Sequence, residues 1–191
     1  MRVSNVESVV GSSGIDSVTL EGGGTLAVSG VETLVGGSDT DIATMLAAAT
    51  LRVSTVETVI GSSGSDTVTV LGGTPTAVSA VETVTGTTAT DTVTMLDAGS
   101  IAASSIETLI GSTDTSDALR MLGAGAASVS AIESVIGSAG ADSVAMLDTG
   151  TISVSGVDTV VGTSGTDVAQ MMGAGTVRVS GVETVLGSSG A

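Results

Sequence analysis

The sequence predicts an all-β protein, a right-handed parallel β-solenoid with about 25 residues and three short strands in each coil. Three observations lead to this prediction. A motif related to V-E-T-V returns at a nearly constant interval along the whole chain. Each repeat contains three short apolar runs separated by glycine, serine and aspartate. The chain has no aromatic residue, so its core must be built from aliphatic side chains that can stack in successive coils.

The repeat is defined by the acidic residue of V-E-T-V. Its spacing is 25 residues, except for one interval of 26: Glu7, Glu32, Glu57, Glu82, Glu107, Glu133, Asp158 and Glu183. The extra residue lies between Gly111 and Asp117, where a polar stretch is expected to bulge outward. Residues 1–191 are therefore expected to form a single array of about 7.5 repeats, either a segment of a longer repeat protein or a stacking filament unit.

The three apolar runs of each repeat are expected to be β-strands. In the second repeat they cover residues 26–29, 31–35 and 41–46. Runs of four to six residues between turn-forming clusters are typical of strands and too short for helices. If each repeat makes one coil, equivalent strands lie about 4.8 Å apart and pair in parallel, and such crossovers are right-handed in almost all proteins.

Equivalent residues of successive repeats are therefore expected to lie directly above one another. Three columns are mainly valine and would form the inner wall, among them Val6, Val31 and Val56. A fourth column is rich in methionine and is interpreted as filling gaps in the core. The columns predict an aliphatic core that runs through every coil.

Charge and composition exclude several classes of function. The chain has 20 acidic residues against four arginines and no lysine, for a formal net charge of -16. Such a surface disfavours binding to nucleic acid or to anionic membranes and favours cations. No apolar run is long enough for membrane insertion, and the first 20 residues lack the pattern of a secretory signal. A serine recurs in every repeat, yet without histidine or lysine it has no base, and the chain is predicted not to be an enzyme.

The turn after V-E-T-V is rich in glycine and aspartate. In the first repeat it reads Gly11-Ser12-Ser13-Gly14-Ile15-Asp16-Ser17-Val18-Thr19. It resembles the nonapeptide G-G-x-G-x-D-x-U-x of the repeats-in-toxin family, the haemolysin-type calcium-binding repeats of secreted bacterial proteins. The first glycine, fourth glycine and sixth aspartate return at Gly61, Gly64 and Asp66, at Gly137, Gly140 and Asp142, and at Gly162, Gly165 and Asp167. In nearly every repeat the second glycine is replaced by serine or threonine.

The resemblance implies a stacked β-roll that binds Ca²⁺ between coils and lies outside the cell or on the surface of a bacterium. The sixth-position aspartates are the implied metal ligands: Asp16, Asp41, Asp66, Asp91, Asp117, Asp142 and Asp167. A column of aspartates 4.8 Å apart would also repel itself by about 3 to 4 kcal/mol per pair at an effective dielectric of 20, which a divalent cation would offset. The alternative is that each aspartate accepts backbone N–H bonds within its own turn. The glutamates of V-E-T-V are interpreted as a solvated face.

The sequence thus predicts a structural or adhesive extracellular module, such as a surface-layer subunit, an adhesin stalk or a filament, with end-to-end self-association. Three alternatives stay open: a self-assembling fibril unit without metal, an ice-binding face, and a polysaccharide-active β-helix enzyme. The ice-binding alternative depends on Thr67-Val68-Thr69 and Thr92-Val93-Thr94, a pattern that later repeats lose. The enzyme alternative is disfavoured because a catalytic site breaks repeat symmetry, whereas these acids recur in every repeat.

Overall fold

The computed structural model describes residues 1–188, and every regular element in that range is a β-strand. The described residues contain no helix that could cross a membrane. The chain forms two compact units, one over Met1–Leu96 and one from Asp97 onward. The predicted all-β class is confirmed.

Each repeat contains three strands, which we call first, second and third strands by their order in the repeat. The first strands are β1 (Arg2–Val3), β4 (Gly24–Ser29), β7 (Thr50–Ser54), β10 (Thr76–Ser79), β13 (Ser100–Ser104), β16 (Gly125–Ser130), β19 (Gly150–Ser155) and β22 (Arg178–Ser180). The second strands are β2 (Ser8–Val10), β5 (Thr33–Val35), β8 (Thr58–Ile60), β11 (Thr83–Thr85), β14 (Thr108–Ile110), β17 (Ser134–Ile136), β20 (Thr159–Val161) and β23 (Thr184–Leu186). The third strands are β3 (Ser17–Leu20), β6 (Asp41–Met45), β9 (Thr67–Val70), β12 (Thr92–Met95), β15 (Ala118–Met121), β18 (Asp142–Met146) and β21 (Asp167–Met171).

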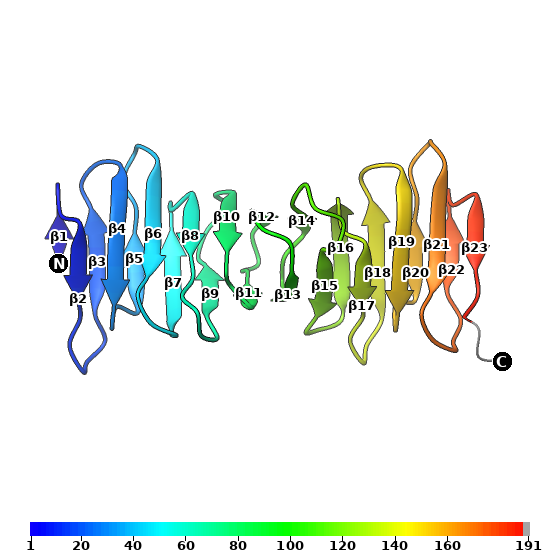
Figure 1. Cartoon of the computed structure of the whole chain (residues 1–191), viewed down its shortest axis with the longest axis horizontal. Helices are drawn as coiled ribbons and strands as arrows, with labels where there is room; N and C mark the ends of the chain where they lie inside the picture. Colours follow the sequence, from blue (N-terminus) through cyan, green and yellow to red (C-terminus); the bar gives the residue numbers. More distant parts are fainter. Residues whose placement is uncertain (189–191) are drawn as a thin grey trace. The chain divides into compact units, whose positions relative to one another are not determined.

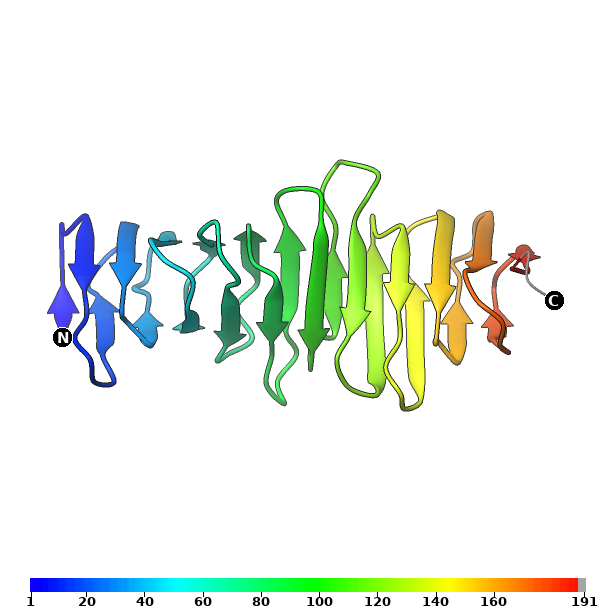
Figure 2. The same cartoon turned by 60° about the horizontal axis from the view of Figure 1, so that its bottom comes forward.

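Successive strands alternate between two parallel sheets in each unit. In the first unit the sheets have the orders β1-β3-β5-β7-β9-β11 and β2-β4-β6-β8-β10-β12. In the second unit they have the orders β13-β15-β17-β19-β21-β23 and β14-β16-β18-β20-β22. Figures 1 and 2 show this alternation: β2, β4 and β6 lie side by side, with β1, β3 and β5 in the other sheet. The parallel β-solenoid architecture is therefore confirmed.

The coil itself differs from the prediction of 25 residues and three strands. One turn of the solenoid contains two strands and about 17 residues, and the chain makes about 11 turns. Arg2 pairs with Thr19, and Thr33 pairs with Arg52, so the interval varies with the length of the connecting turn. Because a repeat has three strands and a turn only two, each repeat advances the solenoid by one and a half turns.

The predicted stacking of like residues on like residues is consequently wrong. Val3 in β1 pairs with Leu20 of a third strand, whereas its repeat equivalent Val28 lies in β4 of the other sheet. Within one sheet, Val18, Leu34 and Val53 form a row that mixes third, second and first strands. Such a row tolerates the mixture because all its members are aliphatic residues of similar size.

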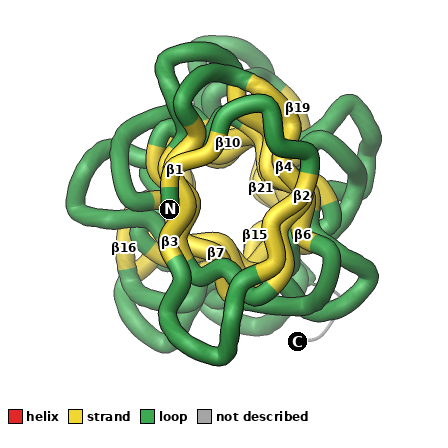
Figure 3. The backbone as a smooth tube through the Cα atoms, turned by 90° about the vertical axis from the view of Figure 1, so that its left-hand side faces the viewer, coloured by secondary structure: helices red, strands yellow, loops and turns green. Residues whose placement is uncertain are grey.

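The core lies between the two sheets and is aliphatic, as the sequence predicts. Inward and outward positions alternate along each strand, and the inward ones are buried. The largest side chains with almost no exposed surface include Leu26, Leu34 and Leu51 in the first unit and Ile101, Leu109 and Ile152 in the second. Viewed along the chain, the strands line the inside and the turns project outward (Figure 3). The turns therefore carry the polar residues.

Candidate functional site

Three kinds of turn connect the strands, and we name them by their residues in the third repeat. The short turn, residues 55–57, joins a first to a second strand and contains a residue with positive φ, here Thr55 at 51°. The aspartate turn, residues 61–66, joins a second to a third strand. The small-residue turn, residues 71–75, joins a third strand to the next first strand. Because strands alternate between sheets, each edge of the coil stack presents these turns in rotation.

The seven candidate aspartates therefore do not form one column. The aspartate turn with Asp16 leads from the even-numbered to the odd-numbered sheet, and the turn with Asp41 leads in the opposite direction. Consecutive aspartates thus lie at opposite edges, and the next aspartate at the same edge is two repeats away. The predicted repulsion between aspartates 4.8 Å apart is absent from this arrangement, because unlike turns separate them.

Each candidate aspartate accepts a backbone hydrogen bond inside its own turn. The Oδ2 atom lies 2.6 Å from the N–H nitrogen of the second turn residue in all seven turns, namely Ser12, Gly37, Ser62, Thr87, Ser112, Ser138 and Thr163. Where that residue is serine or threonine, its hydroxyl also donates to the same oxygen, as Ser62 does to Asp66 at 2.8 Å. This contact explains why a hydroxyl residue replaces the second glycine of the nonapeptide.

The aspartates also connect their turn to the coils on both sides. The Oδ1 atom of Asp66 accepts the N–H of Ala49 from the preceding small-residue turn at 2.9 Å. In the other direction, the N–H of Asp66 donates to Oε2 of Glu82 in the following short turn at 2.8 Å. We call this pair of contacts the aspartate bridge. Its N–H to carboxylate half recurs between Asp16 and Glu32, Asp41 and Glu57, Asp117 and Glu133, Asp142 and Asp158, and Asp167 and Glu183.

The glutamates of V-E-T-V are therefore not merely a solvated face, and sequence reasoning missed their role. Each acidic side chain in these pairs lies 16 residues after the aspartate whose N–H it accepts. That interval is close to one turn of the solenoid, so the contact could be recognised only with the coil length known. Charged acceptors make such bonds worth about 1.5 to 3 kcal/mol each.

Two aspartates show how the turn controls ionisation. The hydroxyl of Thr163, which donates to Asp167 at 2.7 Å, is the main cause that lowers the pKa of Asp167 below its usual value. At Asp41 the equivalent residue is Gly37, which has no hydroxyl, and burial raises the pKa despite the Gly37 N–H. The Oδ1 atom of Asp41 is also buried without a hydrogen-bond partner. A side chain at Gly37 is excluded because its Cβ would lie 2.9 Å from the nitrogen of Gly22.

The turn with the extra residue keeps the same hydrogen bonds. The N–H and hydroxyl of Ser112 both donate to Asp117, at 2.6 and 2.7 Å, across five residues instead of four. Residues 113–116 are exposed. The insertion thus bulges outward as predicted, and the coil retains its spacing.

The aspartate positions do not fit a calcium ion. Both carboxylate oxygens of Asp66, Asp117, Asp142 and Asp167 already face N–H donors. An ion needs six to eight oxygen lone pairs, whereas these oxygens are directed at the positive ends of amide dipoles. Among residues 1–188, no group of three or more acidic side chains is placed to hold a metal. The hydrogen-bonding alternative is the one that the geometry supports.

The outward faces of the strands differ in charge from the turns. All four arginines lie on exposed strand positions, and the acidic residues found within strands, such as Asp142, are buried at the strand start. The two T-x-T segments proposed for ice binding lie in β9 and β12, which belong to different sheets. Thr69 does lie beside Thr85, but its other neighbour is the exposed Arg52. A continuous threonine array is therefore not formed by these segments.

Comparison with family models, with curated proteins and with solved structures finds no match for the chain. Function is therefore inferred from the arrangement of the residues.

Proposed function

We propose that the chain is a structural or adhesive module that acts outside the cell, with its acidic residues holding the coils together. One observation carries the proposal: the acids that recur in every repeat are engaged in hydrogen bonds to backbone amides of their own and neighbouring turns. Carboxylates used in this way are not available for proton transfer or nucleophilic attack. Their periodic use favours a scaffold over a catalyst.

The extracellular part of the proposal comes from the resemblance of the aspartate turns to secreted bacterial repeats, and the right-handed coil comes from the general rule for parallel crossovers. Antibodies against the chain are expected to label intact cells of the source organism before permeabilisation. Labelling only after permeabilisation would contradict an extracellular location. Release of reducing ends from any of a panel of polysaccharides would instead favour the enzyme alternative.

Calcium provides a separate test of how the coils are held. Since the aspartate oxygens already accept N–H bonds, thermal unfolding followed by circular dichroism is expected to give the same melting temperature with calcium and with chelator. A melting temperature that rises with calcium concentration would mean that the turns rearrange around the ion, as the family resemblance implies.

End-to-end self-association is a second part of the adhesive proposal. Open strand edges of a parallel sheet can pair with another chain. Sedimentation velocity over a range of protein concentrations is expected to show linear oligomers, and negative-stain images should show filaments. A single monomeric species at the highest concentration would leave the module as a scaffold that does not polymerise.

A further inference from the structure

The turns leave a cleft at one recurring place in the repeat. Three clefts of about 100, 230 and 410 Å³ each lie between a short turn and the small-residue turn of the next coil. The smallest is lined by residues of the 131–133 and 147–150 turns, and the middle one by residues of the 156–158 and 172–177 turns. Recurrence in different repeats shows that the cleft follows from the turn order.

The reason is that the aspartate bridge binds only two of the three neighbouring turn pairs. It joins the small-residue turn to the aspartate turn and the aspartate turn to the short turn. Contact between a short turn and the following small-residue turn needs another group. At the smallest cleft Asp148 supplies it, accepting the N–H of Ala131 at 3.1 Å and the hydroxyl of Ser130 at 3.3 Å.

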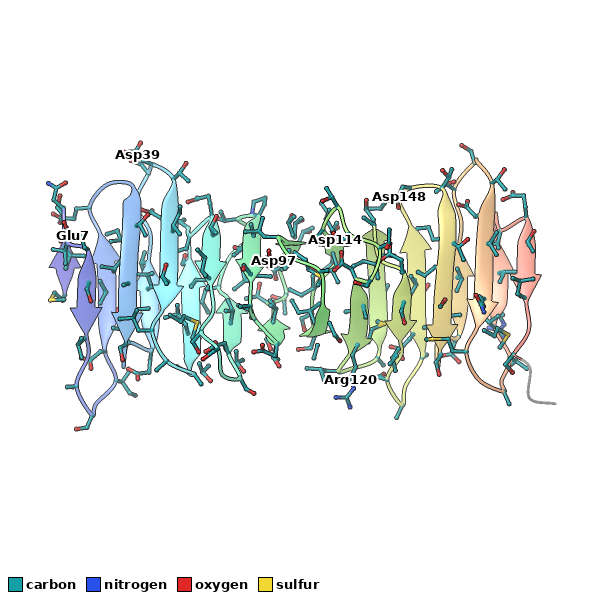
Figure 4. All side chains as sticks on the ribbon, in the orientation of Figure 1. Glu7, Asp39, Asp97, Asp114, Arg120 and Asp148 are labelled. Carbon is teal, nitrogen blue, oxygen red and sulfur yellow. The ribbon has the colours of Figure 1, made fainter. Side chains whose placement is uncertain are left out.

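The smallest cleft has an apolar floor and a charged rim. Val129, Ile132, Met146 and Ile152 line it and are buried in the core. The rim carries Glu133 and Asp148, which come from different coils (Figure 4 labels Asp148). One oxygen of each carboxylate is held by backbone N–H, of Asp117 and of Ala131 respectively. Both carboxylates are thus oriented before any ligand arrives, which lowers the entropy cost of binding.

Charge decides which occupant suits this cleft. Two carboxylates on a chain of formal charge -16 attract cations and repel anions. The apolar floor offers nothing to an inorganic ion but can bury the methylene stem of a basic side chain. A second copy of this chain is a poor source, because it has no lysine and brings the same negative charge.

We propose that this cleft is a docking site for a lysine or arginine side chain of a basic partner protein. The cationic head lies between Glu133 and Asp148, and the stem covers Ile132 and Met146. The inference goes beyond the scaffold role, because the aspartate bridges would hold the coils equally well without any ligand.

The probes are n-butylammonium, ammonium and a capped tetralysine peptide, observed in methyl-resolved NMR spectra of the whole chain. Butylammonium is expected to shift the methyl signals of Ile132, Met146 and Ile152, whereas ammonium at equal concentration is not. Glu133→Gln and Asp148→Asn should each weaken tetralysine binding about two- to fivefold, the range for one exposed ion pair. Asp114→Asn is the control, since it removes the same charge from the exposed 113–116 loop.

A gain-of-binding variant keeps the test independent of lost stability. In the middle cleft the residue equivalent to Asp148 is Gly173, whose Cβ would lie 3.8 Å from the hydroxyl of Ser155 without a clash. Gly173→Asp places a second carboxylate beside Asp158 and should increase tetralysine affinity. The proposal is overturned if Asp114→Asn weakens binding as much as the cleft variants, if ammonium and butylammonium give the same shifts, or if Gly173→Asp gains no affinity.

Discussion

At the scale of single residues, the aspartate turn shows how one hydroxyl decides whether a buried carboxylate stabilises the fold. Asp41 and Asp167 are both buried at the start of a third strand and both accept an N–H bond from their turn. Only Asp167 also accepts a hydroxyl, from Thr163, and only its pKa is lowered. The fold therefore favours the ionised form at Asp167 and disfavours it at Asp41.

The pH dependence of stability is expected to differ between Asp167→Asn and Asp41→Asn. Because the pKa of Asp167 is lowered, its contribution is complete above the unfolded value of 3.8 and is lost as pH falls through the folded pKa. The raised pKa of Asp41 has the opposite sign, so the ionised side chain costs stability at neutral pH. Asp167→Asn should lower the melting temperature more than Asp41→Asn at pH 7, with the gap narrowing below about pH 4. Equal losses at pH 7 would show that the threonine hydroxyl is not decisive.

The first glycine of the aspartate turn is expected to be irreplaceable for a steric reason. A Cβ at Gly61 would lie 1.8 Å from the carbonyl oxygen of Ala80 in the short turn of the next coil. Gly61→Ala should therefore cost about 3 kcal/mol, at the upper end for overpacking, measured by urea denaturation. The control is Gly72→Ala, where nothing lies within 4 Å, and this change should be neutral or stabilising by about 0.5 kcal/mol. A mild effect of Gly61→Ala would mean that the coils can separate at that edge.

At the scale of elements, the strands follow from the sequence, but their assignment to coils does not. Three apolar runs per repeat predict three strands, and the structure has them at nearly the expected residues, such as Thr33–Val35 within 31–35. The number of strands per turn depends on where the chain reverses. Glycine, serine and aspartate clusters predict each reversal without giving its angle.

The same gap explains which parts of the candidate site were predictable. The bond from Asp66 to the Ser62 N–H is local, and general turn chemistry predicts it. The bonds from Ala49 to Asp66 and from Asp66 to Glu82 join different coils. They could not be derived while each repeat was assigned one coil, because that assignment places Asp66 beside Asp41 and Asp91.

The contact made by Asp148 can be transferred to another repeat. Gly173→Asp should accept hydrogen bonds from the N–H of Gly156 and the hydroxyl of Ser155, as Asp148 does from Ala131 and Ser130. The expected gain is about 0.5 to 1.5 kcal/mol in the free energy of unfolding, with slower amide exchange at Gly156. Asp148→Ala should lose a similar amount and speed exchange at Ala131. Unchanged exchange in both variants would show that the contact adds no stability.

At the scale of the whole molecule, the repeat and the coil have different periods, and the hydrogen bonds decide which one the chain must respect. Every aspartate bridge requires the order small-residue turn, aspartate turn, short turn along one edge. Removing one complete repeat keeps this order, although all later strands move to the opposite sheet. Removing one coil keeps each later strand in its sheet but breaks the order.

Two deletions in the first unit separate these requirements. Deletion of residues 51–75 removes one repeat, joins Thr50 to Thr76, and should leave a cooperatively folded protein with every remaining bridge intact. Deletion of residues 51–67 removes about one coil but places Val68 of a third strand directly after a small-residue turn. Although it removes fewer residues, it should give the lower melting temperature by circular dichroism and fewer protected amides, because Asp66 is lost and Glu82 no longer accepts its N–H. If the shorter deletion were as stable as the longer one, strand pairing alone would determine the fold, and the aspartate bridges would be incidental to it.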